Sequence, residues 1–153
     1  MTPEERLARM NLELPKTSAP VGAYVPAVRA GSLAWTSGQL PTRAGKLIHV
    51  GTVGAEVELE AAEECARVAV LNGLAALAGL LGDLGKVRRV VQVTGFVSSA
   101  PDFVEQHLVL NGASELLAEV FDEAGRHSRA AVGVASLPLN APVEVMLLVE
   151  VAD

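Results

Sequence analysis

GRHSRAAVGVASLPLNAPVEVMLLVEV, residues 125–151, decides the fold class of this chain. The stretch predicts two strands joined by a short loop, because its apolar residues alternate with the period of two that pleated strands require. Nearly every residue in it is apolar, yet Arg129 opens the first strand and Glu144 lies inside the second. Two charges in a segment otherwise suited to burial need either a partner or a function.

The rest of the chain adds strands and helices around this stretch. Extended or strand structure is predicted for residues 18–31, 32–40, 41–54 and 86–98, the third of which contains a hairpin. Helices are predicted at residues 3–11, 57–81 and 99–124, the last opened by Ser99 and Asp102 in the pattern of a capping box. This order predicts a single α+β domain over residues 1–153, with one mixed sheet and two helices packed on one face.

Alternation along the final strand predicts two faces of different character. The odd-numbered residues from Val143 to Val151 form an unbroken apolar row that suits packing under the helices. Glu144, Met146 and Leu148 share the opposite face.

The preceding strand is predicted to direct its valines, Val132 among them, toward the helices. That places Arg129 and Ala131 on the same outer face as Glu144. The outer face is too apolar to face water, so we predict that it packs against another copy of the chain. A structural salt bridge between Arg129 and Glu144 across two neighbouring strands is the alternative.

Charge and composition exclude several classes of function. The formal net charge of −6 and the pI near 5.1 argue against a general binder of phosphate backbones. One Trp, one Tyr and three Phe are too few for an extended base-stacking platform. The basic cluster of Lys86, Arg88 and Arg89 is interpreted as a solvated strand edge. Nucleic acid is therefore not expected as a partner.

The sequence predicts a cytoplasmic protein without membrane contact. The first residues carry charges where a signal peptide needs an apolar core, and no run of 18 apolar residues is free of interruption. Cys65 is the single cysteine, which excludes a disulfide within the chain and fits a reducing compartment.

Cysteine and histidine chemistry is not expected. Cys65 falls in a helix predicted to be buried, so it is interpreted as a core thiol rather than a nucleophile. His49, His107 and His127 lack metal-ligand spacing, so no metal site is predicted. His127 is the one histidine close to Arg129 in sequence, and a surface or loop role is the favoured interpretation for it.

Three segments of the chain resemble the RidA family, also called the YjgF family. SRAAVGVASLPLNAPVEV is similar to its C-terminal signature: an Arg at the start of a strand, a V-x-V-A-x-L-P run and a Glu in the last strand. GAYVPAVRAGSLAWTSGQLP resembles its N-terminal half, and FVSSAPDFVEQHLVLNGASELLAEVF resembles its central block. The resemblance covers residues 18–152 in order.

The resemblance implies a chorismate-mutase-like α+β fold and a homotrimer with clefts between its subunits. Archetypal members of the family hydrolyse reactive 2-imino and enamine acids to 2-oxo acids and ammonia, and need no cofactor or metal. The resemblance also implies that residues 1–17 are an N-terminal extension typical of a divergent branch.

Five residues match family positions with known roles. The resemblance implies that Arg129 holds the carboxylate of the substrate, which suits the parallel N–H donors of a guanidinium. It implies that Glu144 orients or activates the attacking water. Gly38 would add a backbone N–H donor, and Tyr24 and Asn111 would line the pocket.

Ala131 departs from the family pattern, because the archetype has a cysteine two residues after the arginine. Chemistry by a thiol at this position is excluded, while attack by water is not. Two functions therefore remain: an imine or enamine deaminase, and a non-catalytic protein that binds a small carboxylated metabolite. Ribonuclease activity is a third alternative, against which the acidic charge and the scarcity of aromatic residues weigh.

Overall fold

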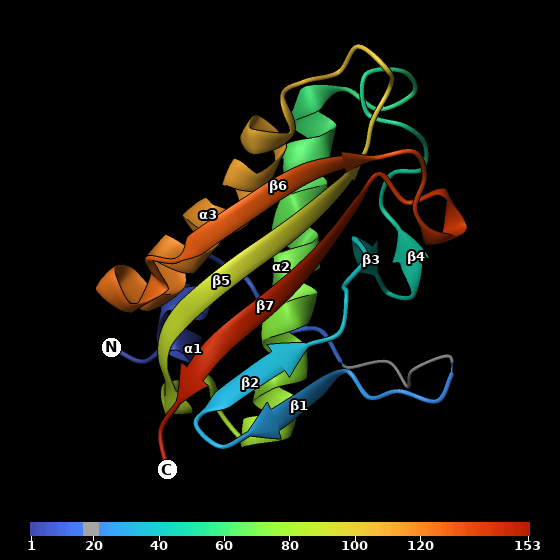
Figure 1. Cartoon of the computed structure of the whole chain (residues 1–153). Coiled ribbons are helices and arrows are strands. Elements are labelled where there is room, and N and C mark those ends of the chain that lie inside the picture. Colours follow the sequence, from blue (N-terminus) through green and yellow to red (C-terminus); the bar gives the residue numbers. More distant parts are fainter. Residues whose placement is uncertain (17–21) are drawn as a thin grey trace.

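A five-stranded sheet with its helices on one side forms the body of the computed structural model, which describes residues 1–16 and 22–153 (Figure 1). The helices are α1 (Pro3–Arg9), α2 (Leu59–Leu81) and α3 (Gln106–Phe121), with short 3-10 turns η1 (Leu84–Lys86), η2 (Asp122–Gly125) and η3 (Pro138–Asn140). The strands are β1 (Ala27–Ala30), β2 (Leu33–Thr36), β3 (Thr42–Arg43), β4 (Lys46–Leu47), β5 (Val87–Ser98), β6 (Ser128–Val134) and β7 (Val143–Val151).

The sheet is mixed, as the sequence predicts. Its strand order is β1-β2-β7-β5-β6, so the last strand of the chain lies at the centre and β6 lies at an edge. β5 and β6 run parallel, and the other neighbours are antiparallel. β3 and β4 form a separate hairpin, which confirms the hairpin predicted between residues 41 and 54.

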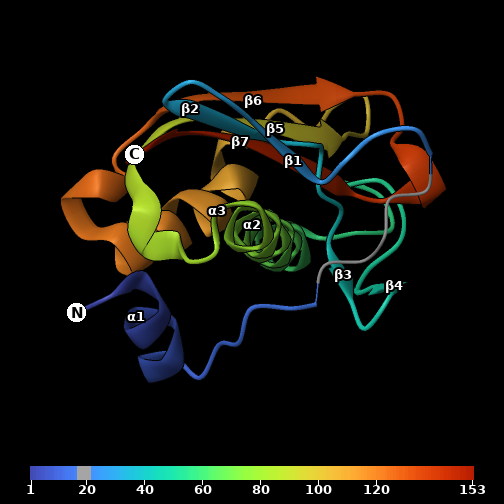
Figure 2. The same ribbon diagram turned by 90° about the horizontal axis from the view of Figure 1, so that it is seen from below.

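The helices occupy one face of the sheet. α2 and α3 lie directly beneath it, and α1 lies farther out (Figure 2). α1 begins with a capping box between Thr2 and Glu5 and buries Leu7, and the Glu4 carboxylate accepts a hydrogen bond from the Leu84 N–H at 2.6 Å. The structure therefore confirms the two helices predicted on one face, α2 and α3, and adds α1 on the same side of the sheet. The predicted end of the N-terminal extension, Thr17, lies outside the described residues.

Alternation along β7 is confirmed. The odd-numbered residues from Val143 to Val151 are all buried, and the even-numbered ones are partly exposed. These buried side chains pack against α2, whose Ala and Leu residues are buried along most of its length. α2 ends at Gly82, which has a φ of 98° that glycine adopts without strain.

α2 is the one helix of the described residues that is long and apolar enough to cross a membrane. However, 61% of its most apolar window is buried inside the protein. Its apolar composition is therefore that of a core helix packed under a sheet.

Two glycines allow α3 to approach its neighbours closely. A Cβ on Gly95 of β5 would overlap the Leu110 side chain of α3. A Cβ on Gly112 of α3 would overlap the backbone carbonyl of Glu63 in α2. Since protein interiors are close-packed, the distance of α3 from both the sheet and α2 depends on these missing side chains.

The predicted boundaries of α3 are wrong at both ends. Ser99 does not cap it, because its hydroxyl donates to the Val97 carbonyl at 2.8 Å and the helix begins seven residues later at Gln106. The helix ends at Phe121 rather than Ala124, because Asp122 has a φ of 54° and the chain continues as η2. Of the extended segment predicted at residues 18–31, the structure describes residues 22–31, among which only β1 is a strand; Pro20 lies outside the described residues.

Gly112→Ala is expected to destabilise the protein by about 1–3 kcal/mol, because the new methyl group would collide with backbone that cannot move aside. Gly79→Ala is the matched control: Gly79 is an exposed position of α2, where alanine stabilises a helix by up to about 1 kcal/mol. Urea unfolding measures both changes. Equal stability of the two variants would contradict the close packing of α2 and α3.

Candidate functional site

Arg129 lies on the helix face of the sheet, and the prediction that it shares a face with Glu144 is wrong. β6 pairs with β5 in the register Val93↔Arg129, Gly95↔Ala131. Paired residues of neighbouring strands point to the same face, and Val93 is part of the core beneath the helices. Arg129 and Ala131 therefore point toward α3.

The prediction failed because it assigned the larger side chains of β6 to the core. α3 passes so close to β6 that small residues are needed there: Ala131 packs against the core, and a Cβ on Gly133 would meet the Gln106 and Ser99 side chains. Val132 consequently faces outward and is 41% exposed.

Glu144 lies on the open face of the sheet, opposite to the helices. Its partner on β5 is Phe96, and Gly95, whose face is covered by Leu110, pairs with Val145. Arg129 and Glu144 thus lie on opposite faces, and β5 separates their strands. The salt bridge considered above does not form within the chain.

Arg129 is held by three hydrogen bonds to α3, one of them to the predicted site residue Asn111. Its Nη1 donates to Asn111 Oδ1 at 2.9 Å and to Ser114 Oγ at 3.1 Å, and its Nη2 donates to the His107 carbonyl at 3.1 Å. We call Arg129, Asn111 and Ser114 the arginine group. These bonds use three of the five guanidinium N–H donors, so the Nε donor and one Nη2 donor remain. No carboxylate of the described residues lies within ion-pair distance of this guanidinium.

Glu144 lies against Gly38, another predicted residue. A Cβ on Gly38 would come within 2.8 Å of the Glu144 carboxyl carbon, so any other residue at the end of β2 would make the carboxylate shift from this position. Burial raises the pKa of Glu144 above its ordinary value of 4.5. A raised pKa moves a carboxylic acid toward the neutral pH range in which general acids and bases work best.

Tyr24 belongs to the same end of the sheet as Gly38. The Ser37 hydroxyl donates to the Val25 carbonyl at 2.6 Å, and the Ser37 N–H donates to the Pro26 carbonyl at 2.8 Å. These bonds tie the Tyr24 loop to the end of β2, and the Tyr24 side chain itself is 56% exposed. We call Glu144, Gly38 and Tyr24 the glutamate group. The five predicted residues therefore form two groups rather than one.

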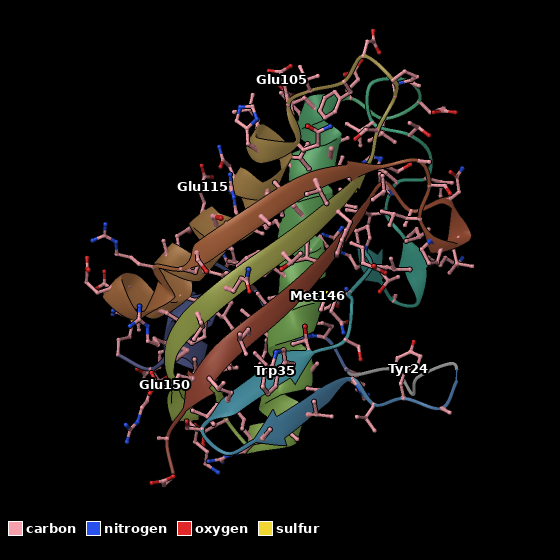
Figure 3. The ribbon with its side chains drawn as sticks, in the orientation of Figure 1. Tyr24, Trp35, Glu105, Glu115, Met146 and Glu150 are labelled. Carbon is pink, nitrogen blue, oxygen red and sulfur yellow. The ribbon has the colours of Figure 1, made fainter. Side chains whose placement is uncertain are left out.

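The open face of the sheet is apolar. Trp35 of β2 and Met146 of β7 lie on it, turned away from α2, with Tyr24 on the loop beyond them (Figure 3). Leu148, paired with Trp35, continues this surface, and Gln92 and Thr94 complete a shallow hollow beside Met146. This confirms that Met146 and Leu148 face away from the helices.

Ser114 and His127 are functional candidates that the sequence analysis missed or left open. Ser114 Oγ lies 2.9 Å from His127 Nε2 and 3.1 Å from Arg129 Nη1. Asn111 and Ser114 are three residues apart on a helix, and this spacing placed both on one face of α3. The sequence contains this spacing, but the spacing could not identify Ser114 as a partner of Arg129 until the structure showed that α3 faces Arg129.

The other reactive residues lie outside both groups. Cys65 is buried in α2, and burial raises the pKa of its thiol to about 12, which fits a core residue. His49 lies 3.8 Å from Glu64 on the far side of the helices. The described residues contain no cluster of three or more His, Cys, Asp and Glu side chains that could hold a metal ion.

Comparison with known proteins settles the family. The family model described as "YjgF/chorismate mutase-like, putative endoribonuclease" matches residues 4–151. The chain belongs to this family. The resemblance noted in three sequence segments is thereby confirmed, and so is the chorismate mutase-like α+β fold.

Several known proteins match nearly the whole chain. Protein TCP17 of Trypanosoma cruzi is 43% identical over 145 residues, which cover 94% of this chain and 91% of that protein. Atu1372 from Agrobacterium tumefaciens has a TM-score of 0.90 at 48% identity, covering 98% and 92% of the two chains. A "putative endoribonuclease" from Shewanella oneidensis has a TM-score of 0.96 at 38% identity, covering 99% and 100%.

Glu144→Gln is expected to raise the melting temperature at neutral pH. Because the folded state raises the pKa of Glu144, ionisation costs stability as the pH rises above 4.5, and the cost is complete above the raised pKa. The gain should therefore shrink as the pH falls and vanish below about 4.5, where the wild-type residue is protonated in both states. Thermal unfolding across this range measures the difference, and a pH-independent difference would contradict the burial of the charge.

Proposed function

We propose that this protein hydrolyses small 2-imino or enamine acids to 2-oxo acids and ammonia, at a site shared by two copies of the chain. The observation that carries the proposal is the Arg129 guanidinium, fixed by α3 with adjacent N–H donors left over. Family membership supports the same reading.

Arg129 is the anchor for the substrate carboxylate in this proposal. A carboxylate has two oxygens that match two adjacent guanidinium donors, and charge-assisted bonds of this kind are stronger than neutral ones. The other three donors are engaged by α3, so the guanidinium is oriented before the ligand arrives. Orientation in advance reduces the entropy lost on binding.

Glu144 handles the proton of the attacking water. The substrate enters as the protonated imine. As a carboxylate, Glu144 takes a proton from water while the water oxygen bonds to the carbon of the C=NH₂⁺ group, whose π electrons move to nitrogen and give a neutral carbinolamine. As an acid, Glu144 returns that proton to the amino nitrogen; it then takes the hydroxyl proton as the C=O bond forms and the C–N bond breaks, and the released ammonia carries that proton away as ammonium. The raised pKa of Glu144 suits both halves of this cycle.

Ala131 is consistent with attack by water. It points toward α3 and packs against the core, two residues along β6 from Arg129. A methyl group can neither attack the C=N carbon nor exchange protons, so the reaction depends on Glu144.

Two copies are needed because the arginine and glutamate groups lie on opposite faces of one sheet. The apolar surface around Met146, Leu148 and Trp35 supplies a reason for a second copy to cover the Glu144 face. We propose that the copies form the homotrimer typical of the family, with Arg129 of one subunit facing Glu144 of the next.

A non-catalytic protein that binds a small carboxylate is the second candidate. It is favoured by the same Arg129 geometry, which recognises a carboxylate whether or not Glu144 acts on the ligand. Turnover separates the two candidates, because a binder is stabilised by pyruvate without accelerating ammonia release. Cleavage of RNA, the activity printed in the names of some relatives, would need a basic surface that a net charge of −6 does not favour.

Arg129→Ala is expected to lower the rate of ammonia release from an imine generated in situ by roughly two orders of magnitude or more, since the anchor for the carboxylate is lost. Arg126→Ala is the matched control, because Arg126 is an exposed arginine three residues away that pairs with Glu123 at 3.5 Å. An ammonia assay with amino-acid oxidase as the imine source measures both. Normal release by folded Arg129→Ala protein would contradict the proposal.

Mixing inactive subunits tests the shared site. Arg129→Ala and Glu144→Gln chains are each expected to be inactive alone. Co-refolded in equal amounts, they should recover about a quarter of the wild-type activity, because one site in four combines intact groups from two neighbours. No recovery in assembled mixed protein would mean that both groups act from the same chain.

A further inference from the structure

A line of hydrogen bonds runs from Arg129 through α3 to the turn before β6. Arg129 Nη1 donates to Ser114 Oγ at 3.1 Å, and Ser114 Oγ lies 2.9 Å from His127 Nε2. His127 Nδ1 lies 2.6 Å from the Gly125 carbonyl oxygen. His127 is partly buried, so these contacts are shielded from water on one side.

The chemistry of the two ends determines the direction of the two outer bonds in this line. A guanidinium can only donate, so the Ser114 oxygen accepts from Arg129 and its hydrogen is available to His127. A carbonyl can only accept, so His127 Nδ1 carries the proton that reaches Gly125. In the Nδ1–H tautomer, His127 Nε2 carries no proton and accepts the Ser114 hydrogen, so that every group in the line has a partner.

We propose that Ser114 and His127 are positioning residues, which fix the Arg129 guanidinium so that its unused N–H donors select a carboxylate over an uncharged ligand. The inference rests on the proposed role of Arg129 as the carboxylate anchor. Asn111 alone holds Nη1 from one direction. Ser114 supplies a second acceptor, and His127 orients the lone pairs of that acceptor by taking its hydrogen.

His127 determines the direction in which the Ser114 hydroxyl points. A serine inside a helix can turn its hydroxyl to the carbonyl one turn earlier, which would direct the hydrogen away from His127. The acceptor at His127 Nε2 competes with that alternative, and the Gly125 carbonyl keeps the imidazole in the required tautomer. Losing either residue therefore loosens the guanidinium without removing its charge, because only the bonds to Asn111 and to the His107 carbonyl still hold it in place.

The experiment uses four variants of the full chain. Ser114→Ala removes the intermediate hydroxyl. His127→Asn keeps an amide near the position of Nδ1 but does not reach Ser114, whereas His127→Gln places an amide oxygen near the position of Nε2. Ser128→Ala is the matched control, because this hydroxyl neighbours Arg129 but donates to the Val91 carbonyl at 2.9 Å.

Binding of pyruvate and of pyruvamide, which differ by one charge and have nearly the same shape, reports the selectivity. Ser114→Ala and His127→Asn are expected to bind pyruvate roughly three- to tenfold more weakly than wild type and to change pyruvamide binding little. His127→Gln and Ser128→Ala are expected to stay close to wild type. In the ammonia assay, Ser114→Ala and His127→Asn should raise KM by a similar factor and leave kcat within about twofold. This is the result expected when an interaction that binds the substrate and the transition state equally well is lost.

Each outcome bears on the inference. If wild-type protein binds pyruvate and the Ser114→Ala and His127→Asn variants bind it with the same affinity, the positioning role is overturned and the proposed function stands. Failure of wild-type protein to bind pyruvate would overturn both. Long-range proton–nitrogen NMR gives a test that is independent of ligand: a proton on Nδ1 of neutral His127 supports the inference, and a proton on Nε2 overturns it.

Discussion

Leu110 of α3 rests directly on Gly95 of β5, and this contact holds α3 against one face of the sheet. On the other side of α3, Gly112 lets the helix reach the backbone of α2. α2 and α3 therefore occupy a single layer under the sheet, and the opposite face has no cover within the described residues. Apolar side chains such as Met146 and Trp35 lie on that face, so the packing of α3 leaves an uncovered apolar surface on the sheet.

The same closeness of α3 determines the composition and the chemistry of β6. Only Ala131 and Gly133 fit between the strand and the helix, while Val132 is turned outward. Arg129, at the start of β6, points along the helix and finds acceptors at Asn111, Ser114 and the His107 carbonyl. A side chain that would be mobile on an open edge is thereby oriented.

Glu144 experiences a different environment on the other face. It lies over Gly38 and is partly buried, and burial raises its pKa. The chain thus separates an oriented cation from a carboxylic acid suited to proton transfer, with the sheet between them. Under the proposed hydrolysis, this division would make activity dependent on assembly, because neither group has its counterpart in the same molecule.

Much of this could be predicted from the sequence, because some patterns have one physical solution. The unbroken apolar row of β7 indicates a buried face, the Ala- and Leu-rich segment ending at Gly82 indicates a largely buried helix, and three motif segments identified the family. The pattern of β6 is compatible with two orientations, since small residues alternate with valines and either the small residues or the valines can face a helix. Only the distance of α3 from the sheet decided that Arg129 points inward, beside Ser114 and His127, and that Glu144 points outward. That distance depends on contacts between residues far apart in the chain, which no local pattern records.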